Sequence, residues 1–213
     1  MSVKSAGILL FRIIAGSSRE IGAKVTEPDM TGPEATEPDV TEPDVTEPEA
    51  IEPVLAGQDA SGLEVLLVHP GGPFWAGKDD GSWSIPKGIY QAEEDPLQAG
   101  KRELFEETGF SPAGPDSSFH DLGSIRQPSK KTVRIWALRC SNDCRNYDWE
   151  RAEVRSNPFT MEWPKGSGIT REFPEIDRAE WFDLAAAKKK ILKGQAGFLD
   201  RLERMVESIE GPS

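Results

Sequence analysis

Three glutamates in the stretch KRELFEETGF, residues 101–110, have a spacing that could support chemistry. If the stretch is helical, Glu103, Glu106 and Glu107 stand at positions i, i+3 and i+4, so their carboxylates share one face. Like charges about 5 Å apart repel by roughly 3 kcal/mol at an effective dielectric constant near 20. Two interpretations account for such a stripe. It is either a solvated acidic face or a site for a hard divalent cation such as Mg²⁺, which binds carboxylate oxygens together with substrate phosphates.

The sequence around the glutamates favours the cation site. From Gly88 the chain reads GIYQAEEDPLQAGKRELFEETGF, with Glu94 after five residues and Arg102 after seven more. This stretch resembles the Nudix box, G-x5-E-x7-R-E-U-x-E-E-x-G-U with U a bulky apolar residue, and every specified position matches, including Gly109. A chance match in a chain of this length has a probability on the order of 10⁻⁷. The chain is therefore identified as a member of the Nudix hydrolase superfamily, which implies an α/β/α sandwich with a mixed β-sheet.

The resemblance implies a role for each specified residue. The usual metal ligands of Nudix enzymes correspond here to Glu103, Glu106 and Glu107, with Mg²⁺ or Mn²⁺ as the cofactor. Gly88 lets the backbone come close, so its carbonyl can be a further ligand. Arg102 can orient a carboxylate, although it could also form an ordinary surface ion pair. Glu94 is commonly structural or a water-mediated ligand, and Gly109 is the C′ glycine that ends the helix.

The implied reaction is metal-assisted hydrolysis of a nucleoside diphosphate linked to another group, with a bound water attacking phosphorus in line. The general base stays open. One of the box glutamates could serve, or an acid from a distant loop could reach the site. The distant candidate is Glu175 in REFPEIDRAEWF, with Glu172 behind it, and both could equally be solvated loop charges.

The substrate class is suggested by residues outside the box. The stretch WSIPKG, residues 83–88, resembles the W-x-x-P-K-G of dinucleoside polyphosphate and diphosphoinositol polyphosphate hydrolases within the superfamily, and Lys87 could meet a phosphate. Four bases cluster near one predicted turn and could bind a long polyphosphate or simply be solvated: Arg126, Lys130, Lys131 and Arg134. Trp136, Trp163 and Phe173 could stack on a base, but isolated aromatics more often pack in a core or rim.

We therefore expect a pyrophosphohydrolase that acts on a nucleoside polyphosphate, with a dinucleoside polyphosphate as the substrate. The alternatives are a nucleoside triphosphate pyrophosphohydrolase that sanitises the nucleotide pool, or a nucleotide-binding sensor without activity. A third alternative is an interaction protein that works through its acidic repeat.

Strands and helices alternate along the sequence, as in an α/β domain. Residues 5–15 and 63–69 are predicted to be buried strands that form a hairpin, and SWSIP at 82–86 a short strand. Helix 96–108 should begin after the N-cap Asp95, with Pro96 at its first position and Gln98 completing a capping box. Further strands are predicted at 119–126, 132–140 and 179–182, and helices near 183–193 and 195–209.

An acidic repeat interrupts the predicted hairpin. The chain has 213 residues and a net charge of −12, and residues 26–55 are pentads of the TEPDV type with ten acids and no base. The proline in each pentad disfavours helix, so we expect a disordered insertion in one domain formed by residues 1–25 and 56–213. The remainder holds 27 acids against 25 bases, which gives no general attraction to nucleic acid.

The cysteines and the apolar segments bear on location. Cys140 and Cys144 are too few for a disulfide-built domain, and with two histidines in the chain a zinc site is not expected. An intracellular, reducing compartment fits best, and we expect a cytoplasmic protein. The run AGILLFRII faintly resembles a signal peptide, but Arg12 interrupts it and no convincing cleavage site follows. No stretch approaches the length of a membrane span.

Overall fold

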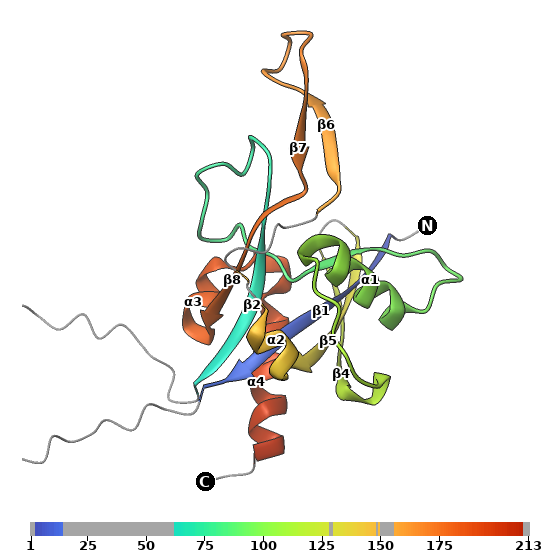
Figure 1. Ribbon diagram of the computed structural model, residues 1–213, viewed down its shortest axis with the longest axis vertical. Coiled ribbons are helices and arrows are strands. Elements are labelled where there is room, and N and C mark those ends of the chain that lie inside the picture. Colours follow the sequence, from blue (N-terminus) through green and yellow to red (C-terminus); the bar gives the residue numbers. More distant parts are fainter. Residues whose placement is uncertain (1–2, 15–61, 128–129, 148, 150–155, 211–213) are drawn as a thin grey trace, which may run out of the picture.

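The computed structural model describes residues 3–14, 62–127, 130–147, 149 and 156–210, so the acidic repeat at 26–55 lies outside the described residues. Its centre is a mixed sheet in the order β4-β5-β1-β2-β8, with β3 paired to β1 (Figure 1). The strands are β1 (Lys4–Ile13), β2 (Leu63–Pro70), β3 (Lys87–Ile89), β4 (Phe119–Arg126), β5 (Thr132–Arg139) and β8 (Ile176–Asp183). β1 and β5 are parallel, and the other pairs are antiparallel.

β1 is buried on both faces, which explains its nearly continuous apolar sequence. Its C-terminal end pairs with β2 through Phe11↔Val65 and Ile13↔Leu63, so the predicted hairpin pairing of the two segments is confirmed. The N-terminal half of β1 leaves β2 and pairs with β3 instead. β3, the strand that leads into the Nudix box, therefore pairs with the part of β1 that β2 does not reach.

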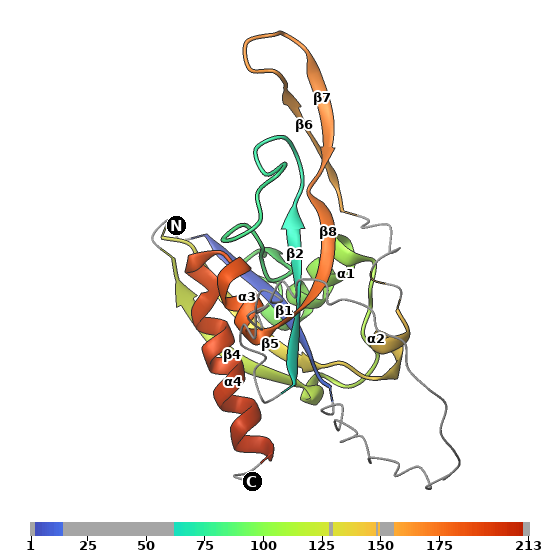
Figure 2. The same ribbon diagram turned by 90° about the vertical axis from the view of Figure 1, so that its left-hand side faces the viewer.

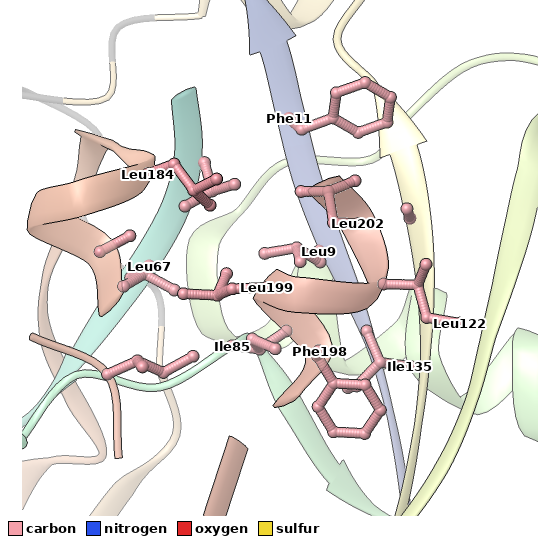
Figure 3. Packing of buried hydrophobic residues seen from close by; sticks show 14 of the residues in the cluster. Leu9, Phe11, Leu67, Ile85, Leu122, Ile135, Leu184, Phe198, Leu199 and Leu202 are labelled. Carbon is pink, nitrogen blue, oxygen red and sulfur yellow. The ribbon is translucent and has the colours of Figure 1, made fainter. Parts of the chain in front are cut away.

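Helices cover both faces of the sheet and complete the predicted α/β/α sandwich (Figures 1 and 2). On one face lie α1 (Pro96–Thr108) and the short α2 (Asn142–Asn146), and on the other α3 (Leu184–Lys190) and α4 (Ala196–Glu210). The core under α3 and α4 contains residues of β1, β2, β4, β5 and both helices (Figure 3): Leu9, Phe11, Leu67, Leu122, Ile135, Leu184, Phe198, Leu199 and Leu202. A second core under α1 contains Ala6, Ile8, Leu10, Leu66, Ala99, Leu104 and Trp136. Burial of each large aliphatic side chain contributes about 1.5–3 kcal/mol.

A second, two-stranded sheet was not predicted. β6 (Pro158–Glu162) and β7 (Thr170–Pro174) form an antiparallel hairpin that projects beyond the main sheet beside the loop after β2 (Figures 1 and 2). We call residues 158–174 the arm. It leads directly through Glu175 into β8.

The SWSIP segment differs from its prediction as a strand. Trp83 and Ser84 make only isolated bridges, to Ile191 and Val68. The backbone N–H of Ile85 donates to the buried side chain of Gln195 at 2.9 Å, and a proline follows, so this segment has no ladder to join. The strand begins only at β3.

Cys140 and Cys144 also differ from expectation, because they form a disulfide. Their Cα atoms are 5.4 Å apart, a separation that suits a disulfide, since α2 begins just after β5 ends. The prediction of a reducing compartment did not anticipate this pair. None of the helices in the described residues has the length and apolar character needed to cross a membrane.

Candidate active site

Helix α1 positions the glutamates of the Nudix box. Its first turn is capped as predicted, because the carboxylate of Asp95 accepts hydrogen bonds from the backbone N–H groups of Leu97 and Gln98, each at 3.0 Å. The side chain of Gln98 turns away to donate to Asp116, so the capping box is only half formed. The helix ends at Gly109, whose φ of 73° is the left-handed conformation that favours glycine.

Close approach of α1 to the sheet fixes where the acidic stripe lies. A Cβ atom on Gly100 would stand 3.3 Å from backbone atoms of Gly7 on β1, so glycine allows the helix to lie directly on the strand. Ala99 and Leu104 are fully buried in the same interface. Glu103 and Glu107 follow Gly100 by three and seven residues, so they lie on the same side of the helix and meet β3 at Gly88 and Lys87.

Arg102 holds three carboxylates at once. Its Nε donates to Glu94 at 3.1 Å, and its Nη1 donates to Glu103 at 2.8 Å and to Glu106 at 3.0 Å. These hydrogen bonds raise the pKa of Arg102 above its usual range, and the bond to Glu94 has the largest effect. The predicted orienting role of Arg102 thus matches its geometry, and it links Glu94 to the stripe.

Glu103 sits against the backbone of β3. A Cβ atom on Gly88 would lie 2.0 Å from the carboxyl carbon of Glu103, so only glycine leaves room for this carboxylate. The side chain of Glu103 is only 13% exposed. Burial raises the pKa of Glu103, against the opposing charge of Arg102.

Glu107 lies deepest in the stripe. Its Oε2 accepts a hydrogen bond from the backbone N–H of Lys87 at 3.2 Å. Burial raises the pKa of Glu107 to about 8; the charges of Glu103 and Glu175 add to this effect, and the charge of Lys87 opposes it. A half-buried carboxylate with a raised pKa is a group whose ionised form an added cation would stabilise.

The residues of the stripe fit a hard divalent ion. They offer the carboxylates of Glu103, Glu106 and Glu107 and the carbonyl of Gly88, all oxygen donors of the kind that Mg²⁺ and Mn²⁺ accept. Within the described parts of the chain, no group of three acidic, histidine or cysteine side chains is arranged to hold a metal ion. Arg102 donates hydrogen bonds to Glu103 and Glu106, and the Lys87 N–H donates to Glu107.

The predicted basic residues separate into two groups. Lys131 is half-buried, and burial lowers its pKa; the nearby charge of Lys87 acts in the same direction, while Glu103 and Glu107 oppose it. Lys87 and Lys131 therefore lie together beside the stripe. Arg134 instead forms an ion pair with Asp121 at 2.5 Å and stacks over Trp136.

Two other residues of the basic turn lie at its surface. Arg126 is exposed at the end of β4, opposite Thr132 of β5. Lys130 is exposed in the turn between these strands, with a φ of 64°. The predicted cluster of four bases is therefore spread over the hairpin.

Glu175 is the distant acid that the fold brings to the site. It is exposed in the bend between the arm and β8, and its carbonyl accepts a hydrogen bond from the N–H of Gly71 at 2.8 Å. Its charge contributes to the raised pKa values of Glu103 and Glu107. Glu172 is exposed on β7, opposite Thr160 of β6.

His69, a buried histidine that links the loop after β2 to β8, was not identified from the sequence. The Nδ1 atom of His69 lies 2.7 Å from Asp177 of β8, and its Nε2 lies 3.0 Å from the carbonyl of Lys78. His69 thus ties the loop after β2 to β8 beside Glu175. Its place in the sequence HPGGPFW gave no hint of a partner more than 100 residues away.

The sandwich carries the glutamates of the Nudix box on α1, and comparisons with known proteins name the family. The family model described as NUDIX domain matches residues 53–202, so the chain belongs to the NUDIX family and is a Nudix pyrophosphohydrolase, a hydrolase that acts on acid anhydrides.

Individual relatives agree with this assignment. The RNA pyrophosphohydrolase of Rhizobium meliloti is 31% identical over 140 residues, covering 55% of this chain and 74% of that protein. A mutT/nudix family protein from Listeria innocua has a similar structure, with a TM-score of 0.50, 13% identity and coverage of 98% and 96% of the two chains. The NUDIX domain of Shewanella oneidensis NrtR, solved with ADP-ribose, has a TM-score of 0.50 and 12% identity, with coverage of 97% and 89%. The two structures support the fold alone.

Proposed function

We propose that the protein hydrolyses a phosphoanhydride bond of a dinucleoside polyphosphate with Mg²⁺ or Mn²⁺. The observation that carries this proposal is the arrangement around β3. Glu103 lies against Gly88, Glu107 accepts a hydrogen bond from the Lys87 N–H, and Glu106 shares Arg102 with Glu103. Lys87, Lys131 and Glu175 lie close enough to act electrostatically on these carboxylates. The set offers oxygen ligands for a cation, two positive charges for phosphates and a separate carboxylate for proton transfer.

Each group has a distinct part in the proposed reaction. When bound, the metal lowers the pKa of a water and neutralises phosphate charge. Glu103, Glu106 and Glu107 would hold it, with Gly88 as a further ligand. Arg102 keeps Glu103 and Glu106 oriented toward the same side of the helix.

Glu175 serves proton transfer in this proposal, and Lys87 and Lys131 neutralise the charge of the substrate phosphates. Glu175 accepts the proton of the attacking water, because it is a carboxylate near the stripe that does not belong to the helix. Lys87 and Lys131 pair with the phosphates next to the scissile bond. A longer polyphosphate gives these two lysines more oxygens to contact.

A substrate panel tests the proposal. Diadenosine tetraphosphate, ATP and other nucleoside triphosphates, and ADP-ribose would be incubated with the protein and Mg²⁺, and the products separated by anion-exchange chromatography. The expected result is a higher kcat/KM for the dinucleoside polyphosphate. A higher value for a triphosphate would favour a pool-sanitising enzyme, and binding without turnover of any compound would favour a nucleotide sensor.

An RNA 5′ end is the second candidate substrate, because the curated relative with 31% identity is an RNA pyrophosphohydrolase. The near balance of 27 acids and 25 bases outside the repeat argues against a long nucleic-acid track. A 5′-triphosphorylated oligonucleotide belongs in the same panel. The proposal also keeps a cytoplasmic location, which fractionation of cells that express a tagged chain would test.

A further inference from the structure

The arm has one apolar face. Side chains alternate along paired strands, so the odd-numbered residues share a side. They are Phe159, Met161, Trp163, Ile169, Arg171 and Phe173. Phe159 and Phe173 are cross-strand partners with ring centroids 6.0 Å apart, and the N–H of Trp163 donates to Ile169 at 2.8 Å. The even-numbered side of the strands is polar, with Thr160, Glu162, Thr170 and Glu172.

The loop after β2 packs on this face and leaves part of it open. Phe159 lies against Gly72, where a Cβ atom would come within 2.9 Å of its ring. Phe74 meets Trp163 edge to face, with centroids 5.5 Å apart and planes at 76°. Two rings at this angle form a corner instead of a closed stack. Phe74 remains 57% exposed and Ile169 51% exposed, so the corner is accessible to a flat ligand.

Packing within the chain does not account for an aromatic corner in this place. A two-stranded ribbon is marginally stable alone, and an aromatic ring left more than half in water adds little to its folding. Clustered exposed apolar side chains usually mark a binding surface. Aromatic faces with a nearby guanidinium are a common platform for a nucleobase and its phosphate, and Arg171 is exposed on the same side of the arm.

The root of the arm adjoins the acidic stripe. Glu175 follows β7 directly, and it contributes to the electrostatics of Glu103 and Glu107. The N–H of Gly71, at the start of the loop that carries Phe74, donates to the carbonyl of Glu175. From this root the five residues of β6 extend about 17 Å to Trp163, at about 3.3 Å per residue. The corner and the hydrolytic centre are therefore separated by several phosphate units.

We propose that the corner formed by Phe74 and Trp163 binds the nucleoside at the far end of the substrate, with Arg171 contacting the phosphate attached to that nucleoside. This inference rests on the proposed function, and it names the group that makes a dinucleoside polyphosphate preferable to a triphosphate. A nucleoside fits better than an RNA chain, because Glu162 and Glu172 balance Lys165 and Arg171 within the arm. The arm thus lacks the excess of positive charge that follows a nucleic-acid backbone.

Kinetics of arm variants test the proposal. Phe74→Ala and Arg171→Ala should each raise KM for diadenosine tetraphosphate about tenfold, a typical effect of losing one stacking or charged contact to a nucleotide. The kcat value for that substrate, and both constants for ATP, should stay within about twofold, since those steps occur at the stripe. Thr160→Ala, on the other face of the arm, is the matched control and should change neither substrate. Equal loss with both substrates, or no change with either, overturns the proposal.

A binding measurement separates this inference from the proposed function. Metal-free protein is titrated with AMP, and tryptophan fluorescence is followed in the wild type and in Trp163→Phe. Quenching in the wild type that is lost in the variant supports the corner as a nucleoside site, even if the panel shows no hydrolysis. Identical curves exclude it. If Phe74→Ala instead converts a dimer to a monomer in sedimentation, the face binds a second copy of the chain and the nucleoside proposal is wrong.

Discussion

Glu107→Gln should make the metal-free protein more stable at alkaline pH. Glu107 lies deepest in the acidic stripe, where burial raises its pKa to about 8. Glutamine keeps an oxygen that can accept the Lys87 N–H, so the local hydrogen bond is retained while the charge is removed. The substitution therefore isolates the free energy of ionising this one group.

The sign and magnitude follow from linkage. The pKa of Glu107 is about 8 in the folded protein and 4.5 for a free glutamate, so folding favours the protonated form. Below pH 4.5 the group has no effect on stability, and between pH 4.5 and 8 the folded state loses stability as pH rises. The two pKa values correspond to roughly 5 kcal/mol at full ionisation. For a domain of this size, the variant should melt on the order of 10 °C above the wild type at pH 8.5, and near it at pH 5.

Thermal melts between pH 5 and 9 in a chelating buffer would measure this effect. The burial of Glu103 raises its pKa as well, so the melting temperature of the variant still falls somewhat as pH rises. The diagnostic quantity is therefore the difference in melting temperature between wild type and Glu107→Gln at each pH. Glu93→Gln, at an exposed position, is the control and should follow the wild type. Mg²⁺ should also raise the melting temperature of the wild type less at pH 6 than at pH 8.5, because binding must displace a proton from Glu107.

Parallel melting curves for wild type and Glu107→Gln would refute this reasoning about burial. Activity gives an independent check, since the variant should lose nearly all turnover. If it kept more than about a tenth of the wild-type kcat at saturating Mg²⁺, Glu107 would not be a metal ligand.

Three further predictions concern the contact between Gly88 and Glu103, the lysine proposed to bind phosphate, and the acidic repeat. Gly88→Ala should lower kcat about 100-fold with little change in melting temperature, because its methyl group would displace the Glu103 carboxylate. An unchanged kcat would show that the contact between Gly88 and Glu103 does not matter for catalysis. Lys131→Ala should reduce kcat/KM about tenfold for diadenosine tetraphosphate and less for ATP, and an equal or larger loss with ATP would exclude a role in binding the longer chain. Deletion of residues 26–55, with a short turn joining the flanking strands, should preserve hydrolysis and hold or modestly raise stability, because less loop-closure entropy is lost. A deleted protein that folds but has no turnover would show that the repeat acts at the site.

Local signals explain what the sequence predicted well. Helix α1 agrees with its predicted bounds because a cap at Asp95, a proline and Gly109 lie within the helix itself or next to it. β5 follows in the same way from the short apolar run IWAL, and β4 has the bounds predicted for it. The site glutamates could be found because their spacing is a property of one helix.

Contacts between distant segments explain what the sequence did not predict. The arm at 158–174 is exposed on most of its length, so its strands lack the apolar runs of a buried strand. The loop carrying Phe74, which is distant in sequence, packs on part of its apolar face. The ion pair of Arg134 with Asp121 across two strands is another contact between distant segments that the sequence did not predict.

The contacts of Arg102 explain how a short helix can hold three carboxylates on one face. Arg102 neutralises Glu103 and Glu106 from the solvent side, with its side chain 39% exposed, while Lys87 opposes the buried charge of Glu107 from β3. Without metal, the stripe is therefore held by one guanidinium and one ammonium group instead of by a cation. A cation bound by the stripe would compete with Arg102 for oxygens of Glu103 and Glu106. We therefore expect Arg102 to affect both the stability of the metal-free domain and its affinity for Mg²⁺, and Arg102→Lys, with a single point charge, would test this.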